Sequence, residues 1–149
     1  MINIETYSDK YYSDVVKIVK NFYDEAVKQY DFDMDKDVLA DTITKLKAQN
    51  AGNAFLLIVD DKCEGILAGI EARGFLNKKR IFQEVIWYIN EPFRRYGVLL
   101  LKNVQALLKA EGFNSMIMAV LENSKTEKIK RLYGQMGFIN FESHWVRSL

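Results

Sequence analysis

The chain has 149 residues, of which 49% are hydrophobic, and its 21 basic and 20 acidic side chains leave a net charge of +1. This length and composition are typical of one globular domain with a sizeable core. The near-neutral charge gives no support for nucleic acid or a membrane surface as the main partner.

Few side chains suited to metal or disulfide chemistry are present. The one cysteine, Cys63, excludes an intrachain disulfide, and the one histidine, His144, leaves no cluster for zinc. We expect Cys63 to be a small core residue and His144 to be a surface or packing residue. No apolar run approaches the ~20 residues of a membrane span, and residues 1–5 alternate like a strand rather than a signal peptide. These features predict a single cytoplasmic domain, residues 1–149, without a metal ion.

The first third of the chain predicts one strand and two helices. A strand is expected over residues 2–7, and Ser8 or Asp9 can cap the helix that follows it. The side chains expected to face inward from this helix are Tyr12, Val15, Val16, Val19, Phe22, Tyr23 and Ala26. A polar and aromatic connection over residues 30–35 either lines a pocket mouth or plugs the end of this helix. A second helix is expected over residues 35–49, with Val38 facing inward.

Three strands joined by short turns follow. They cover residues 54–59, 63–73 and 80–89, with turns at residues 60–62 and 74–79. Gly65 and Gly69 weaken the middle strand and indicate a bulge there.

The last part of the chain alternates helix and strand. A helix over residues 98–111 ends at Gly112, and a strand over residues 115–121 follows. Ser124 and Glu127 have the spacing of a capping box for a helix that ends at Gly137, before a last strand over residues 138–146. This order predicts an α/β fold with a mixed sheet, a parallel crossover and helices on both faces. Ligands of such sheets bind at the carboxyl ends of strands.

The stretch from Glu84 to Leu99 combines a strand, a basic turn and a helix start. Pro92 ends the strand, Arg94 and Arg95 supply positive charge, and the helix begins after Gly97. Free amides and the dipole of a helix N-terminus favour an anion. The alternative is a solvated basic turn and a helix-start glycine without a ligand.

Two motifs resemble the GNAT N-acetyltransferase superfamily. The first is Arg94-x-x-Gly97 after a strand that ends at Ile89, although Leu99 stands where the family has Gly or Ala. The second is a helix that ends Leu-Tyr-x-x-x-Gly-Phe, here residues 132–138. The loosened glycine pattern is similar to that of divergent phage-encoded members. The resemblance implies a GNAT-like fold, with a splay between the fourth and fifth strands.

The resemblance also implies a co-substrate and an acceptor. The co-substrate is acetyl-CoA, and the acceptor is a small-molecule or peptide amine that attacks the thioester directly. The implied cofactor-binding residues are Tyr88, Ile89, Asn90, Arg94, Arg95, Tyr96, Gly97, Val98, Leu99 and Asn123. The leucine at position 99 either crowds the phosphate or turns into the core.

Two residues match the family's proton-transfer positions. Glu84 is the candidate general base, with a solvent-exposed glutamate at a strand edge as the alternative. Tyr133 is the candidate general acid that protonates the leaving thiolate, with a buried tyrosine bonded to a backbone carbonyl as the alternative. The pKa of a tyrosine, ~10, is close enough to that of a thiol, ~8.5, for this transfer.

A second function remains open alongside the enzyme. A binding or structural protein on the same fold would hold acyl-CoA without turnover, or bind no cofactor. Leu99 and the short carboxyl end favour this alternative, since one wall of the acceptor site is then missing or supplied by another subunit in a homodimer. Acidic residues within 31–37 suggest a cationic acceptor, or are simply solvated.

Overall fold

The fold is seen in a computed structural model that describes residues 1–30, 35, 38, 41–42, 45, 52–74, 77–123, 125–147 and 149. These residues form two compact units, Met1–Ala119 and Val120–Leu149, which we describe separately. The single domain expected over residues 1–149 stays a prediction.

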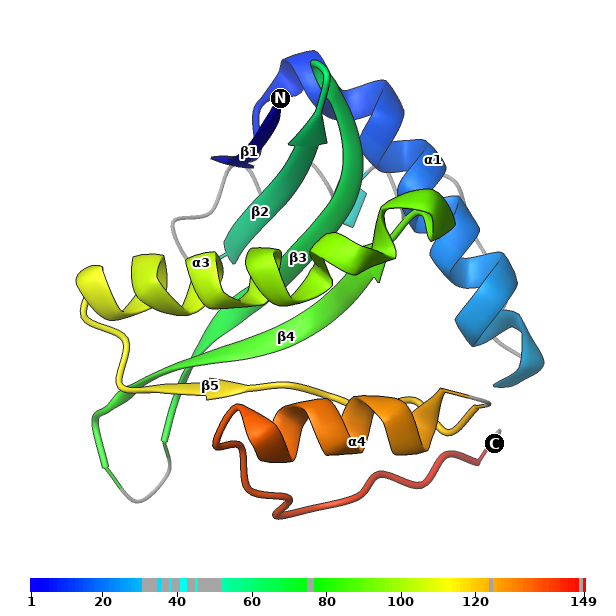
Figure 1. Ribbon diagram of the computed structural model, residues 1–149. Coiled ribbons are helices and arrows are strands. Elements are labelled where there is room, and N and C mark those ends of the chain that lie inside the picture. Colours follow the sequence, from blue (N-terminus) through cyan, green and yellow to red (C-terminus); the bar gives the residue numbers. More distant parts are fainter. Residues whose placement is uncertain are drawn as a thin grey trace. The chain divides into compact units, whose positions relative to one another are not determined.

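The first unit is built on a five-stranded sheet in the order β1-β2-β3-β4-β5 (Figure 1). The strands are β1 (Ile2–Thr6), β2 (Gly52–Val59), β3 (Lys62–Arg73), β4 (Arg80–Ile89) and β5 (Ser115–Ile117). The first four pair antiparallel, and β5 runs parallel to β4. The predicted mixed α/β sheet is therefore confirmed.

The turn between β2 and β3 is as tight as the sequence predicts. Asp60 and Asp61 both have positive φ, +47° and +65°, as in the type I′ turns that suit the twist of a hairpin. The amino group of Met1 donates to the Asp60 carboxylate at 2.6 Å, which ties the start of β1 to this turn.

Both glycines of β3 lie at irregularities in the sheet. Gly65 pairs with Leu57 next to a register shift between β2 and β3. Between β3 and β4, Ala68 pairs with Ile86 but Gly69 pairs with Glu84, so that Val85 is an extra residue in β4. A Cβ at Gly69 would collide with the carbonyl oxygen of Gln83. The predicted bulge is confirmed, and it lies directly beside Glu84.

One face of the sheet packs on α1 (Tyr12–Phe22). Val15 and Ile18 of α1 are buried in a core with side chains of β2, β3 and β4. The inward set predicted for this helix is wrong in two places, because Tyr12 is exposed and Ile18, which was not in the set, is buried. Short helical turns flank α1, namely η1 (Asp9–Tyr11), the π-helical η2 (Tyr23–Val27) and η3 (Lys28–Tyr30). Ser8 stands at the N-cap of η1 but makes no side-chain capping bond there.

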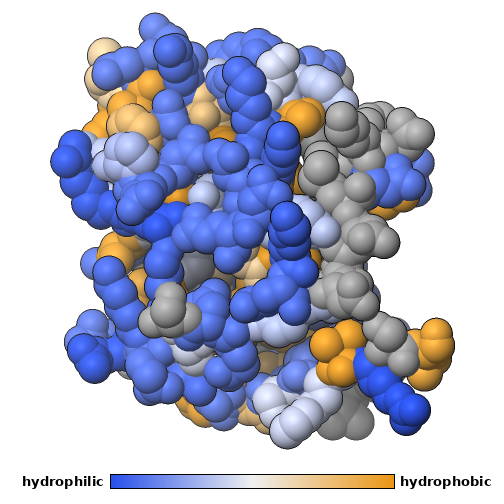
Figure 2. Space-filling view, turned by 90° about the vertical axis from the view of Figure 1, so that its right-hand side faces the viewer, coloured by the Kyte–Doolittle hydropathy of each residue, from blue (hydrophilic) through white to orange (hydrophobic). Residues whose placement is uncertain are grey.

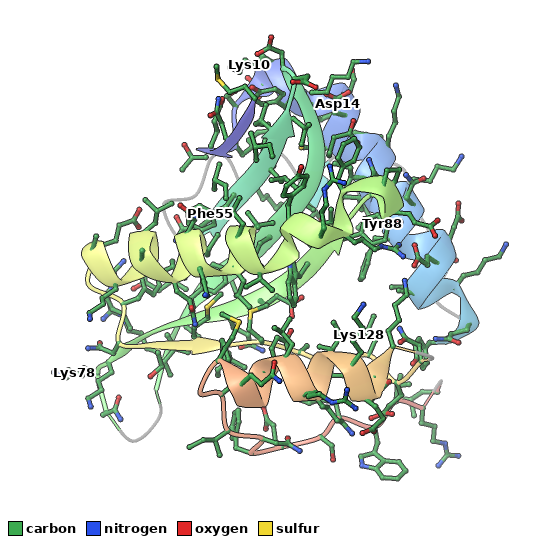
Figure 3. All side chains as sticks on the ribbon, viewed as in Figure 1. Lys10, Asp14, Phe55, Lys78, Tyr88 and Lys128 are labelled. Carbon is green, nitrogen blue, oxygen red and sulfur yellow. The ribbon has the colours of Figure 1, made fainter. Side chains whose placement is uncertain are left out.

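Asp14 fixes α1 to the sheet near the first hairpin. Its carboxylate accepts from the Cys63 amide at 3.2 Å, and Figure 3 shows it on the side of α1 toward the hairpin. The outer side of α1 lies on the face shown in Figure 2, which is mainly hydrophilic. Cys63 itself is buried, as predicted. Burial raises the pKa of its thiol to about 12, which leaves it an inert core residue.

The other face of the sheet is covered by α3 (Gly97–Ala110), as Figure 1 shows. The side chains that α3 buries are Leu100, Leu101, Val104 and Leu108. A 3₁₀ segment, η4 (Glu91–Tyr96), connects β4 to α3. Gly112 ends the helix with a φ of +89°, as predicted. Helices on both faces of the sheet are thus confirmed.

The fifth strand is shorter than predicted, and the last predicted strand is wrong. Regular pairing of β5 ends at Ile117 instead of continuing to Leu121. Residues 138–147, described throughout, have no regular secondary structure, so His144 is not on a strand. Their alternating apolar pattern indicates which side chains share a face, but a strand also needs a partner for its backbone groups. Ile139 and Trp145 are accordingly exposed.

The second unit contains α4 (Thr126–Gln135). The predicted capping box involves Ser124, which lies outside the described residues. The Thr126 hydroxyl instead accepts from the Asn123 amide at 2.7 Å and contacts the Leu121 carbonyl oxygen at 2.9 Å. Gly137 ends the helix with a φ of +85°, as predicted.

The predicted second helix and the loop before it lie largely outside the described residues. Val38, Asp41, Thr42 and Lys45 are helical. The Asp35 carboxylate accepts from the Val38 amide at 3.2 Å, as an N-cap does. Val38 is 61% exposed, so the prediction that it faces inward is wrong.

Candidate active site

The predicted strand, turn and helix start between Glu84 and Leu99 are all present. β4 ends at Ile89, Pro92 stands at the start of η4, and α3 begins at Gly97. Some amides of the turn are used locally, since Phe93 donates to the Asn90 carbonyl and Gly97 to that of Arg94. The first turn of α3 follows directly, and at a helix N-terminus the backbone amides and the helix dipole favour an anion.

Asn90 anchors the turn to the rest of the sheet. Its amide nitrogen donates to the Glu64 carboxylate at 2.8 Å, and its side-chain oxygen accepts from Asn21 at 3.2 Å. Its backbone amide also donates to the Glu64 carbonyl at 2.9 Å. These bonds position the turn. A direct cofactor contact, which the sequence predicts for Asn90, remains a proposal.

Arg94 is held in place from three sides. One guanidinium nitrogen lies 2.6 Å from each carboxylate oxygen of Glu25, and Nε donates to the Ile89 carbonyl at 3.2 Å. The guanidinium also lies 5.7 Å from the centre of the Tyr88 ring. Arg94 is therefore fixed by contacts within the protein, and the alternative of a basic turn without a ligand stays open beside the cofactor site.

Tyr88 joins the same cluster. Its hydroxyl donates to Glu25 at 2.7 Å, and Figure 3 shows it at the end of β4, where the turn passes the α1 helix. Burial, followed by the bond to the Glu25 carboxylate, raises the pKa of Tyr88 above its usual range. Glu25 was not among the predicted site residues. It lies 69 residues before Arg94, and no sequence motif links the two.

Arg95 and Tyr96 form a separate pair on the turn. The Arg95 guanidinium donates to the Tyr96 hydroxyl at 2.9 Å and lies 4.8 Å from the centre of its ring. Both residues are on the turn predicted to bind the cofactor. In this structure they contact each other, whereas Arg94 turns toward Glu25.

The first residues of α3 include Gly97 and Leu99 of the first family motif. A Cβ at Gly97 would lie 3.5 Å from Ile89 Cδ1, an ordinary contact, and its φ of −59° suits any residue. The fold alone therefore does not require glycine at this position. Leu99 is 43% exposed and Val98 is 37% exposed. Leu99 does not turn into the core, which leaves the alternative that it crowds an anion at this helix start.

β4 and β5 separate next to Glu84. The two strands pair only between Ile81–Gln83 and Ser115–Ile117, so the predicted splay is confirmed. Just beyond the last pair, a Glu84 carboxylate oxygen accepts from the Ala119 amide at 2.8 Å. The Val85 bulge lies at the same point of β4.

The environment of Glu84 suits a general base. The side chain is partly buried, so the alternative of a solvated strand-edge glutamate is wrong. Burial raises its pKa to about 7, although the bond from Ala119 acts in the opposite direction. A carboxyl group with this pKa is partly ionised at neutral pH and accepts a proton more readily than an ordinary glutamate.

Tyr133 and Asn123 belong to the second unit. Tyr133 is buried, and its ring centre lies 5.2 Å from that of Phe138. The Phe138 amide donates to the Tyr133 carbonyl, and the Gly137 amide donates to that of Gly134. These bonds form a Schellman motif, with its usual apolar contact. Helix termination therefore accounts for the glycine and the phenylalanine of the second family signature. The Asn123 side chain caps the Lys125 amide at 2.8 Å.

Two further findings concern the described part of the chain. It contains no group of three or more His, Cys, Asp or Glu side chains that could hold a metal ion. Among the helices described there, none is both long and apolar enough to cross a membrane.

Comparison with known proteins identifies the fold. No protein-family model matches the sequence, and no curated protein matches it. Solved structures do match over 99–100% of the chain. One is an aminoglycoside acetyltransferase from an uncultured soil metagenomic sample, with 15% identity over 99% of its length and a TM-score of 0.77. Another is a GNAT family acetyltransferase from Staphylococcus aureus, with 13% identity over 98% of its length and a TM-score of 0.69.

A third match has a different description. It is a transcriptional regulator from Bacillus halodurans, with 11% identity over all of its length and a TM-score of 0.80. At these identities the comparisons show a shared fold. The chain has the GNAT fold, as its two sequence motifs predict.

Proposed function

We propose that the protein is an acetyl-CoA-dependent N-acetyltransferase that acetylates a primary amine by direct attack on the thioester. The observation that carries the proposal is Glu84, a carboxyl group with a pKa of about 7 at the point where β4 and β5 separate. The GNAT fold supports it, because this fold occurs in acetyltransferases of similar length.

The cofactor's pyrophosphate would bind at the start of α3. The amides of this first turn and the helix dipole favour an anion, and Arg94 supplies positive charge beside them. Arg95, Tyr96, Gly97, Val98 and Leu99 complete the turn. The acyl-pantetheine arm would enter between β4 and β5, along Tyr88, Ile89 and Asn90. Asn123 is proposed as a further cofactor contact on the family resemblance alone.

Proton removal is the first chemical task. A lysine-like amine has a pKa of ~10.4, which is ~6 units above that of an ordinary glutamate. With the Glu84 pKa at about 7, the gap is about 3 units, and the free-energy cost of transfer falls from about 8 to about 5 kcal/mol. Glu84 would take this proton directly or through water.

The leaving group and the oxyanion are the remaining tasks. The neutral amine attacks the thioester carbonyl, and a backbone amide near Ile89 would hold the resulting oxyanion. Collapse of the intermediate breaks the carbon–sulfur bond, and Tyr133 would return a proton to the thiolate.

A binding or regulatory protein on the same fold is the second candidate. The exposed Leu99 at the helix start favours it, because a leucine side chain there would crowd a phosphate bound at the helix N-terminus. The match to a transcriptional regulator shows that the fold also occurs in a protein with another description. The acceptor would be a cationic small molecule or a peptide amine, in the cytoplasm. The acidic residues within 31–37 that suggested a cation lie mostly outside the described residues.

Cofactor binding tests the proposal. We expect millimolar acetyl-CoA to raise the melting temperature of the protein, because a ligand that binds only the folded state stabilises it. Adenosine monophosphate at the same concentration is the control, since it lacks the pantetheine arm. Thiol release with a panel of amines then identifies the acceptor. The absence of a thermal shift would contradict the enzyme proposal.

A further inference from the structure

The Glu25 carboxylate is ion-paired with Arg94, the cation that would bind the pyrophosphate of the proposed cofactor. Both Glu25 oxygens lie 2.6 Å from the same Arg94 nitrogen, an ion pair between the end of the first helix and the turn before α3. Both side chains are only partly exposed, 39% for Glu25 and 33% for Arg94. Arginine makes charge-assisted hydrogen bonds of the same kind to carboxylates and to phosphates.

Each member of the pair has a second partner that would remain after an exchange. Glu25 also accepts from the Tyr88 hydroxyl at 2.7 Å, so its carboxylate would keep a donor. Arg94 also donates to the Ile89 carbonyl through Nε, so its side chain would keep its position beside the turn. Replacing one anion by another at Arg94 therefore leaves no charged group without a hydrogen bond.

The backbone around Glu25 is irregular. Regular α-helix ends at Phe22, and Glu25 lies in the π-helical turn Tyr23–Val27, which a 3₁₀ turn follows. Segments of π-helix are rare and occur often at functional sites.

We propose that Glu25 is an internal anion that occupies Arg94 in the free protein and is displaced by the pyrophosphate of the incoming CoA ester. The proposal rests on the proposed function and adds Glu25 to its cofactor site, as a residue that sets affinity. The exchange transfers Arg94 from a carboxylate to a diphosphate. It leaves the Glu25 carboxylate on Tyr88, at the carboxyl end of β4.

The direction in which one substitution changes the affinity for CoA tests this exchange. Calorimetric titration with CoA is carried out on the wild type and on Glu25→Gln, which keeps the shape of the side chain but removes its charge. If Glu25 competes with CoA, Glu25→Gln binds CoA about 3- to 10-fold more tightly. If Glu25 only positions Arg94 for the cofactor, the variant binds more weakly. Equal or weaker binding would therefore overturn the proposal while leaving the proposed function in place.

Four further variants complete the experiment. Glu91→Gln removes a negative charge from the same turn without touching Arg94, and we expect a smaller gain from it. Arg94→Gln should weaken binding, and adding Glu25→Gln to it should restore nothing, because the competition needs Arg94. A gain in the double variant equal to that of Glu25→Gln alone would overturn the proposal. If the glutamine variant folds poorly, Glu25→Ala replaces it, and we expect it to bind CoA more tightly as well. If the wild type and the Glu25 variants all fail to bind CoA, the proposed function itself is wrong.

Discussion

Glu84 owes its properties to two local features of one strand. The extra residue Val85 changes the register of β4 beside it, and β5 stops pairing just before it. The side chain therefore lies where two strands separate, near enough to Ala119 to accept its amide. Partial burial at this point raises its pKa to about 7.

The dependence of rate on pH tests Glu84 as the base. A base must be unprotonated, so kcat/KM should rise with pH and level off above about 7. Glu84→Gln should lower the rate by ~10²-fold and remove this limb. The measurement is thiol release between pH 5.5 and 9, with melting curves to confirm that the variant is folded.

Two acceptor amines of different pKa provide the control for this profile. A limb caused by the acceptor moves when the acceptor is changed, whereas a limb caused by Glu84 stays near pH 7. A wild-type profile that follows the acceptor alone, with an unchanged rate in Glu84→Gln, would remove Glu84 from the mechanism.

At the scale of elements, the end of α4 shows how a family signature can be structural. Gly137 adopts a left-handed conformation, and Phe138 packs on Tyr133 while its amide bonds to the Tyr133 carbonyl. The signature thus stops a helix at a fixed residue, and Tyr133 is three positions inside that end. The orientation of the proposed acid depends on this termination.

Two glycines of α4 should respond in opposite directions to alanine. Gly137→Ala places a side chain at a φ of +85° and should cost about 1 kcal/mol or more in the free energy of unfolding. Gly134→Ala lies inside the helix, where a Cβ meets nothing within 4 Å, and should stabilise by about 0.5–1 kcal/mol. Urea unfolding measures both changes. Equal effects of the two substitutions would contradict this account of the helix end.

Across the whole molecule, local patterns predict local structure well. Proline and glycine at the boundaries of elements predict the strand, turn and helix start between Glu84 and Leu99. The two glycines of β3 predict its irregular pairing. These features depend on residues close together in the chain. The sequence motifs likewise predict the GNAT fold.

Long-range pairing is what the sequence leaves undetermined. Glu25 and Arg94 are ordinary charged residues 69 positions apart, and only the fold brings them together. The alternating pattern of residues 138–146 predicts a strand, but the pattern contains no information about a partner edge. The outward direction of Leu99 likewise depends on where α3 begins on the sheet.

The free energy of unfolding should also depend on pH because of the raised pKa of Glu84. Its usual value of 4.5 is raised to about 7 on folding, so between these values the folded state binds more protons than the unfolded chain. The contribution of Glu84 to stability is full below pH 4.5 and is lost as the pH rises through 7. Glu84→Gln cannot ionise and escapes this loss.

Melting temperatures at pH 5 and pH 8 check this expectation. The wild type should lose more stability than Glu84→Gln over this interval, by about 1 kcal/mol or roughly 3 °C after allowance for partial exposure. All other titrating groups are shared, so the difference isolates Glu84. Parallel curves for the two proteins would contradict the raised pKa.

The turn at Asp60 and Asp61 offers a place for protein engineering. Two consecutive aspartates in left-handed conformations store strain that an asparagine–glycine pair would not. Asp60 has a further task, because the amino group of Met1 binds it. Asp61 has no such contact with Met1, so glycine at position 61 is the change that would relieve strain and keep the anchored N-terminus. A stabilised parent protein of this kind would tolerate the more damaging substitutions that a functional study needs.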